Sequence, residues 1–148
     1  MAEYWFYHLE ASTLEGVLPD LLEKTLSRGW RALVKLPAER LADMDAYLWT
    51  FQDSSFLPHG RDDEPQSDQQ PVLLTSTATV SGGAECVFLI DGEELDIDET
   101  TERCIVMING RSQEDVGRAR KLWKRLKDAG ETLSYWQQTD RGKWEKKA

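Results

Sequence analysis

The first fifty residues alternate twice between a strand pattern and a helix pattern. The aromatic run Glu3–Leu9 is typical of a strand, and apolar residues then recur at helical spacing from Leu14 to Leu26. Arg31–Leu36 is again an apolar strand, and Pro37 opens a second helix pattern. This order favours right-handed crossovers. We therefore expect the first two strands to form a parallel pair within a sheet that is covered by helices.

The start of the first helix is subject to two competing signals. Ser12 and Glu15 have the spacing of a capping box, and Arg28–Gly29 ends the helical pattern. Pro19 lacks an amide hydrogen and is tolerated only in a first helical turn. We therefore expect the regular helix to begin near Gly16.

Four further strand patterns follow, separated by turns and by one more helix. With 148 residues the chain has the length of one domain, 1–148, that can bury a sizeable core. The sequence thus predicts a single-domain, three-layer α/β Rossmann-like fold, with a mainly parallel or mixed sheet flanked by helices. The acidic stretch 93–102 fits either a poor helix or a loop. The predicted strands are Pro71–Thr77, Cys86–Ile90, Arg103–Ile108 and Leu133–Gln138.

A long acidic loop, about residues 52–70, interrupts the regular patterns. Helical periodicity fails after Trp49, and a loop of this length inside a compact domain is usually functional. The large apolar side chains at its start, Trp49 and Phe56 among them, either fix the loop to the core or form an exposed contact patch. A short basic tail, about residues 139–148, ends the chain.

The segment Gly110–Gly130 is the clearest helix in the sequence. Ser112 is its expected N-cap, Asp115 stands in a capping-box position, and Gly130 ends it. One face of this helix is apolar by 100° spacing. Trp123 lies between that face and a border of three cations, Arg120, Lys124 and Lys127, and the opposite border carries Arg118, Lys121 and Arg125. The predicted apolar face consists of Val116, Ala119, Leu122, Leu126 and Ala129.

Charge is divided unevenly along the chain. Residues 1–110 hold 7 basic and 21 acidic residues, whereas residues 111–148 hold 11 and 6, within a total of −9. An acidic body opposes direct binding of long nucleic acid, which needs a broad basic surface. A small basic edge suits one compact anionic partner, although a solvated helix face without function has the same appearance. No apolar run is long enough to span a membrane, and Cys86 and Cys104 are expected to be buried, reduced thiols of a cytoplasmic protein.

The sequence shows few signs of catalytic chemistry. His8 and His59 have neither a cysteine nor a second histidine at metal-site spacing, and no phosphate-binding loop follows the first strand. We expect no cofactor and no metal. Two alternatives remain open: a small enzyme or nucleotide-binding domain with degenerate motifs, its pocket near His8, Asp91 and His59, and direct binding of single-stranded DNA by stacking on Trp123 and Trp136.

Several segments carry a family resemblance. The chain resembles the chi subunit of bacterial DNA polymerase III in its two early strand–helix units, in the loop LWTFQDSSFLPHG at residues 48–60 and in the ending RARKLWKRLKDAG…LSYWQQTDRGKWEKKA (Arg118–Ala148). The resemblance implies a non-catalytic accessory protein of the clamp-loader complex, with an α/β fold. It also implies two partners, the acidic C-terminal tail of single-stranded DNA-binding protein and the psi subunit.

The resemblance also assigns residues to these two partners. The tail-binding positions fall on Arg120, Trp123, Lys124 and Lys127, and the partner-subunit surface would include Trp49 and Phe56. Trp123 stands where the family can have another aromatic residue, so an aromatic ring is retained. Lys127 stands where the family can have arginine, and a lysine lacks the bidentate geometry that arginine offers to a carboxylate.

Overall fold

The computed structural model describes residues 2–50, 59–61, 70–139, 141 and 143–148, and within them all strands form one sheet. The strand order is β3-β4-β2-β5-β6-β1-β7-β8, and every neighbouring pair is parallel except the antiparallel pair β7–β8. The strands are β1 (Glu3–Leu9), β2 (Ala32–Lys35), β3 (Gly60–Arg61), β4 (Val72–Thr75), β5 (Cys86–Leu89), β6 (Arg103–Asn109), β7 (Thr132–Gln138) and β8 (Trp144–Lys146).

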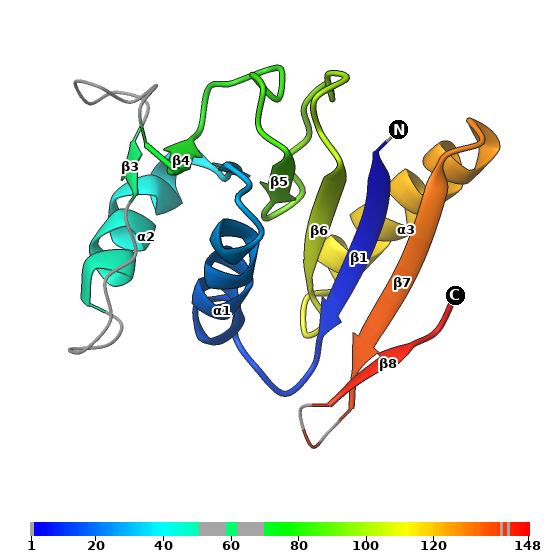
Figure 1. Cartoon of the computed structure of the whole chain (residues 1–148). Helices are drawn as coiled ribbons and strands as arrows, with labels where there is room; N and C mark the ends of the chain where they lie inside the picture. The colour runs from blue at the N-terminus through cyan, green and yellow to red at the C-terminus, as the bar shows by residue number, and fades with distance from the viewer. Residues whose placement is uncertain (1, 51–58, 62–69, 140, 142) are drawn as a thin grey trace.

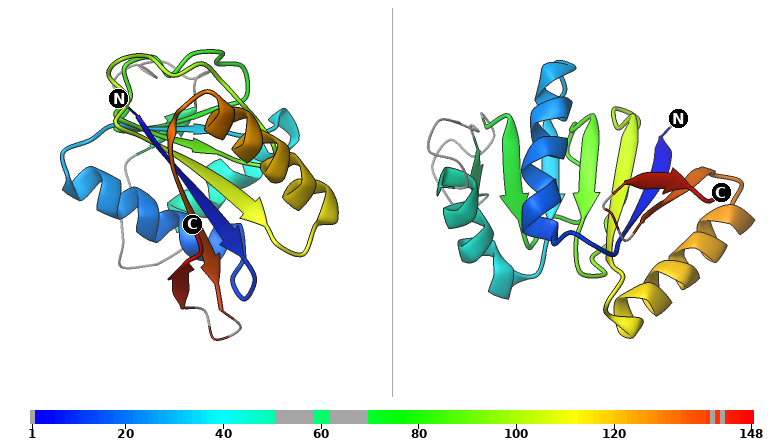
Figure 2. Two further views of the ribbon diagram at one scale, coloured as in Figure 1. Left: turned by 90° about the vertical axis from the view of Figure 1, so that its right-hand side faces the viewer. Right: turned by 90° about the horizontal axis from the view of Figure 1, so that it is seen from below.

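Helices cover both faces of this sheet, which gives the predicted three-layer α/β fold. In Figure 1, α1 (Leu14–Ser27) lies in front of the strands, α3 (Gln113–Asp128) lies behind β6, β1 and β7, and α2 (Ala38–Thr50) lies beside β3 and β4 at the left. The left view of Figure 2 separates α1 and α3 on opposite sides of the sheet. Two apolar clusters match these layers. Leu22 of α1 and Met44 of α2 belong to one, and Ala119 of α3 belongs to the other.

The first two strands are parallel, as expected, but they are not neighbours in the sheet. β1 and β2 are parallel members of one sheet, but β5 and β6 lie between them. The crossover through α1 therefore passes over two strands. The hydrophobic pattern of the first strand and helix does not indicate how many strands the connection crosses. β1 instead pairs with β6 on one side and β7 on the other, so Phe6 stands beside both Val106 and Tyr135.

The first helix begins earlier than its proline suggested. Thr13, not Ser12, is the N-cap, and its hydroxyl accepts a hydrogen bond from the Gly16 amide at 3.1 Å. Pro19 consequently lies inside the helix, where it cannot donate to the carbonyl of Glu15. Pro19 is buried against the core, and this apolar contact offsets part of the cost of the missing hydrogen bond. The predicted end is confirmed, because Arg28 caps the helix and Gly29 has φ +78°.

Two strands were not expected from the sequence. β3 has two residues and pairs with β4 at one edge of the sheet, while β8 arises within the predicted basic tail and pairs with β7. The acidic stretch 93–102 contains no helix, and one isolated bridge joins Asp96 to Val80. Both cysteines are free and buried, as predicted, and burial raises the pKa of Cys86 to about 11. Among the helices of the described residues, none has the length and apolar character to cross a membrane.

Candidate functional site: the basic edge of α3

The N-terminus of α3 is fixed to the end of β6 by short-range polar contacts. The Ser112 hydroxyl accepts a hydrogen bond from the Asp115 amide, as the predicted cap requires. The Asp115 carboxylate does not complete a capping box. It accepts from the Asn109 amide at 2.7 Å and from Arg118 at 3.1 Å. Helix α3 is therefore anchored to its preceding strand through one buried carboxylate.

The apolar side of α3 packs on aromatic residues of β1 and β7. The Trp123 ring meets Phe6 edge-on at a centroid distance of 5.2 Å and Tyr135 at 5.7 Å. Ala119 is buried, and Val116, Leu122 and Leu126 are partly buried in the same cluster. Ala129 was also expected on this face but is exposed. As the C-cap of the helix, it lies beyond the last turn that touches the sheet.

The two charged borders of α3 differ in their partners. On one border Arg118 pairs with Glu114 and Asp115, and Arg125 pairs with Glu94. On the other border, Arg120, Lys124 and Lys127 are exposed. Among the described residues no ion pair engages these three cations. Because positions i, i+4 and i+7 share a helix face, they form a continuous basic edge.

A hollow of about 510 Å³ opens beside this basic edge. Arg120 and Trp123 line it from α3, and Tyr135 lines it from β7, so a cation and two aromatic rings converge there. Lys124 and Lys127 do not line the hollow and continue the basic edge along α3. The full lining is His8, Arg120, Trp123, Tyr135, Gln137, Lys147 and Ala148.

A chain of polar contacts forms one wall of the hollow. His8 Nδ1 lies 2.6 Å from the Tyr135 hydroxyl, and His8 Nε2 lies 2.9 Å from Glu10 Oε1. His8 is buried and hydrogen-bonded. Burial raises the pKa of Tyr135, and the positive charge of Arg120 opposes that shift. Tyr135 is therefore a neutral hydrogen-bonding group that interacts electrostatically with Arg120.

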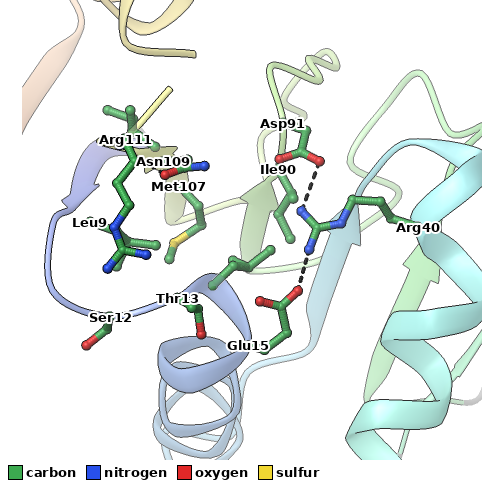
Figure 3. A pocket seen from close by; sticks show the side chains of 12 residues that line it. Leu9, Ser12, Thr13, Glu15, Arg40, Ile90, Asp91, Met107, Asn109 and Arg111 are labelled. Atoms are coloured by element: carbon green, nitrogen blue, oxygen red, sulfur yellow. Dashed lines mark hydrogen bonds and ion pairs between the residues drawn. The ribbon is translucent and has the colours of Figure 1, made fainter. Parts of the chain in front are cut away.

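A second hollow, of about 160 Å³, lies at the carboxyl ends of β1, β5 and β6. This position is where α/β proteins commonly bind nucleotides. Figure 3 shows Arg40 of α2 held between Glu15 of α1 and Asp91 after β5. Burial disfavours the charge of Arg40, but hydrogen bonds and charges from the two carboxylates outweigh it and raise its pKa. Two carboxylates already engage the Arg40 guanidinium, so Arg40 is not available to bind a phosphate.

The residues proposed for an alternative enzyme pocket do not come together. Asp91 lines the crevice of Figure 3, whereas His8 lines the hollow beside α3. His59 is buried elsewhere, with Nε2 3.1 Å from both the carbonyl and a carboxylate oxygen of Asp45. Within the described ranges, no three His, Cys, Asp or Glu side chains gather as metal ligands.

Trp49 lies near the C-terminal end of α2, and its side chain is 49% exposed. Its ring packs against His59 at a centroid distance of 4.2 Å. Exposure of a large aromatic side chain favours the contact-patch alternative over a core position. Phe56, the other residue predicted for this surface, lies outside the described residues.

Sequence reasoning found the α3 half of the hollow and missed the sheet half. Arg120 and Trp123 follow from helical spacing, but Tyr135 and His8 reach the hollow through strand pairing. The alternation of Leu133, Tyr135 and Gln137 on one face of β7 was a readable signal for Tyr135. No such signal existed for Lys147, since β8 was not predicted.

Comparison with known proteins identifies the family of this chain. The family model described as "DNA polymerase III chi subunit, HolC" matches residues 1–134. A relative from Rickettsia prowazekii (strain Madrid E), "Probable DNA polymerase III subunit chi", is 22% identical over 96 residues, which cover 64% of this chain and 58% of the relative. The match thus spans somewhat more than half the length of that relative. Because the family model covers most of the sequence, the chain belongs to the DNA polymerase III chi subunit family.

Proposed function

We propose that this chain is a non-catalytic accessory subunit of the DNA polymerase III clamp-loader complex that binds the acidic C-terminal tail of single-stranded DNA-binding protein. Arg120, Lys124 and Lys127 bind the acidic residues of the tail, and Trp123 contacts its apolar terminal residue. By this contact the subunit links single-stranded DNA-binding protein to the replicase.

The observation that carries this proposal is that both arginines of one border of α3 are paired within the chain, whereas none of the three cations of the other border is paired among the described residues. Arg118 and Arg125 are engaged by acidic side chains of the chain itself. The described residues offer no such acid to Arg120, Lys124 or Lys127, which run beside Trp123 and the hollow. Cations without an intramolecular acid, next to an aromatic hollow, suit a peptide with several carboxylates and an apolar end.

The expected affinity follows from the size of these contacts. Each exposed ion pair contributes about 0–1 kcal/mol. Burial of a Phe-sized side chain adds roughly 1.5–3 kcal/mol. The three ion pairs and the apolar anchor together contribute at most about 6 kcal/mol, and the ordering cost of the peptide lowers this sum. We therefore expect weak binding, with a dissociation constant on the order of tens of micromolar or above. Such binding weakens as salt screens the ion pairs, which suits a contact that must be repeatedly made and broken.

The test is a titration of the protein with a synthetic peptide of several aspartates and a C-terminal phenylalanine, measured by intrinsic tryptophan fluorescence or by calorimetry. The double variant Arg120→Ala/Lys124→Ala should abolish measurable binding, because two cations of the basic edge are removed. Both side chains are exposed, so the melting temperature should fall by no more than a few degrees.

Lys121→Ala/Arg125→Ala is the matched control for this experiment. It removes the same net charge from the same helix, but from the border on the opposite side. Peptide affinity in the control should remain near that of the unmodified protein. Equal losses of peptide affinity in the two double variants would mean that only the net charge of the helix matters. Unchanged affinity in Arg120→Ala/Lys124→Ala would refute the assigned site.

We propose a second contact surface at the end of α2, for the psi subunit or an equivalent clamp-loader component. Exposed Trp49 supports this surface, since large aromatic side chains are frequent anchors at protein interfaces. Phe56 belongs to the same proposal through the family resemblance alone.

A further inference from the structure

The C-terminal hairpin brings a lysine to the hollow from the sheet side. Lys147 follows β8 and lines the hollow together with Arg120, Trp123 and Tyr135. The segment that carries it lies outside residues 1–134, the part matched by the family model. The cation is therefore supplied by a part of this chain beyond the family match.

Strand pairing determines which lysine of the hairpin faces the hollow. In the β7–β8 ladder, Trp136 is paired with Lys146 and Gln137 with Glu145. The Lys147 amide donates a 2.7 Å hydrogen bond to the Tyr135 carbonyl, which continues the ladder by one residue. Paired residues point to the same face, and neighbouring residues point to opposite faces. Lys147 thus shares the α3 side of the sheet with Tyr135, whereas Lys146 shares the other side with Trp136.

The present partner of Lys147 is easily exchanged. Its Nζ lies 3.0 Å from Glu145 Oε2, and both side chains are about half exposed (50% and 54%). An exposed pair of this kind contributes little free energy, so an incoming carboxylate can replace Glu145 at small cost. Lys147 can therefore serve as a cation for a ligand without loss of a buried interaction.

We propose that Lys147 is a second cationic wall of the tail-binding site, opposite Arg120. The inference rests on the proposed function. The apolar terminal residue of the peptide packs on Trp123 and Tyr135, and its free carboxylate lies between Arg120 and Lys147. The acidic residues before it follow Lys124 and Lys127 along α3. Arg120 and Lys127 are seven residues apart, about 10 Å along a helix, which three extended peptide residues span.

The experiment compares Lys147→Ala and Lys146→Ala in the full chain, using the same acidic peptide with a free or an amidated C-terminus. Lys147→Ala should weaken binding of the free acid about two- to fivefold, the range of an exposed ion pair. Amidation should remove most of the difference between Lys147→Ala and the unmodified protein, because the carboxylate charge is then absent. Lys147→Arg should retain the affinity.

Lys146→Ala is the control, because it removes an equal charge from the adjacent residue on the opposite face. If Lys146→Ala and Lys147→Ala bind the peptide alike while Arg120→Ala/Lys124→Ala does not bind, the inference is overturned and the proposed function stands. If the unmodified protein fails to bind the peptide, the proposed function fails and the inference falls with it. A thermal melt of each variant confirms that the hairpin remains folded.

Discussion

At the scale of single residues, the position of Gly110 illustrates how closely the end of β6 approaches β1. Its amide donates a 2.8 Å hydrogen bond to the Leu9 carbonyl. A Cβ atom at this position would collide with that carbonyl oxygen and with the His8 ring. Gly110 is therefore required by close packing, and His8 connects that packing to the wall of the hollow.

We expect Gly110→Ala to destabilise the protein by about 1–3 kcal/mol, because backbone or the His8 ring must shift to admit the methyl group. Gly117, in the middle of α3, has open space where a methyl group would stand and serves as the control. Gly117→Ala should stabilise the helix by about 0.5–1 kcal/mol. Urea denaturation of both variants measures these opposite signs, and a neutral Gly110→Ala would show that the close approach is unimportant.

Residue-level prediction from sequence succeeded where the cause was local. The Ser112 cap and the Gly130 end depend only on neighbouring residues, and both are confirmed. The Asp115 carboxylate was assigned to the capping box but bonds Asn109 and Arg118 instead. Its partner is set by how α3 leaves β6, which the spacing of a cap motif does not describe.

At the scale of elements, α3 is held to the sheet by a polar anchor at its start and by aromatic packing along its length. Asp115 supplies the anchor, and its side chain is nearly buried, with 7% exposed. Trp123 supplies the packing through Phe6 and Tyr135. The basic edge keeps its position relative to the hollow because both attachments fix the rotation of the helix.

Asp115→Ala should therefore reduce the free energy of unfolding by about 1.5–3 kcal/mol, since it removes hydrogen bonds to a charged, buried group. Glu114→Ala is the control: it removes the same charge from the neighbouring residue, whose side chain is 81% exposed. Its effect should stay within about 0.5 kcal/mol. Chemical denaturation measures both, and similar losses would contradict a special role for Asp115.

Elements were predictable from sequence where their patterns were long, and not where pairing alone creates them. β1 was predicted with its observed bounds, Glu3–Leu9, because its aromatic run is distinct. β8 has the composition of a polar tail, and its strand conformation arises from pairing with β7. For this reason the sequence alone does not place Lys147 at the site.

At the scale of the whole molecule, the two proposed contact surfaces lie at opposite ends of the sheet. Trp49 belongs to α2, which lies beside β3 and β4, while the basic edge belongs to α3, which lies behind β6 and β7 (Figure 1). Five strand steps separate β4 from β7, which is about 24 Å. A subunit with this layout can contact two partners without steric competition.

We expect binding at the two surfaces to be independent. Trp49→Ala should lower capture of the psi-type subunit yet leave affinity for the acidic peptide within about twofold, because distant sites add independently. Arg120→Ala/Lys124→Ala should show the reverse pattern. Pull-down assays beside peptide titrations test both directions. Loss of peptide binding in Trp49→Ala, with an unchanged melting temperature, would indicate coupling between the surfaces.

The central position of β1 has a consequence for how the protein is made. β1 is complete at residue 9, but its neighbours β6 and β7 begin at residues 103 and 132. At about 5–20 residues per second, the ribosome needs on the order of 6–25 seconds to deliver both neighbours after β1 emerges. During synthesis β1 therefore remains unpaired for this time, and both of its edges can pair with the wrong strands. Nascent chains of this protein should depend on chaperones until β7 has left the exit tunnel.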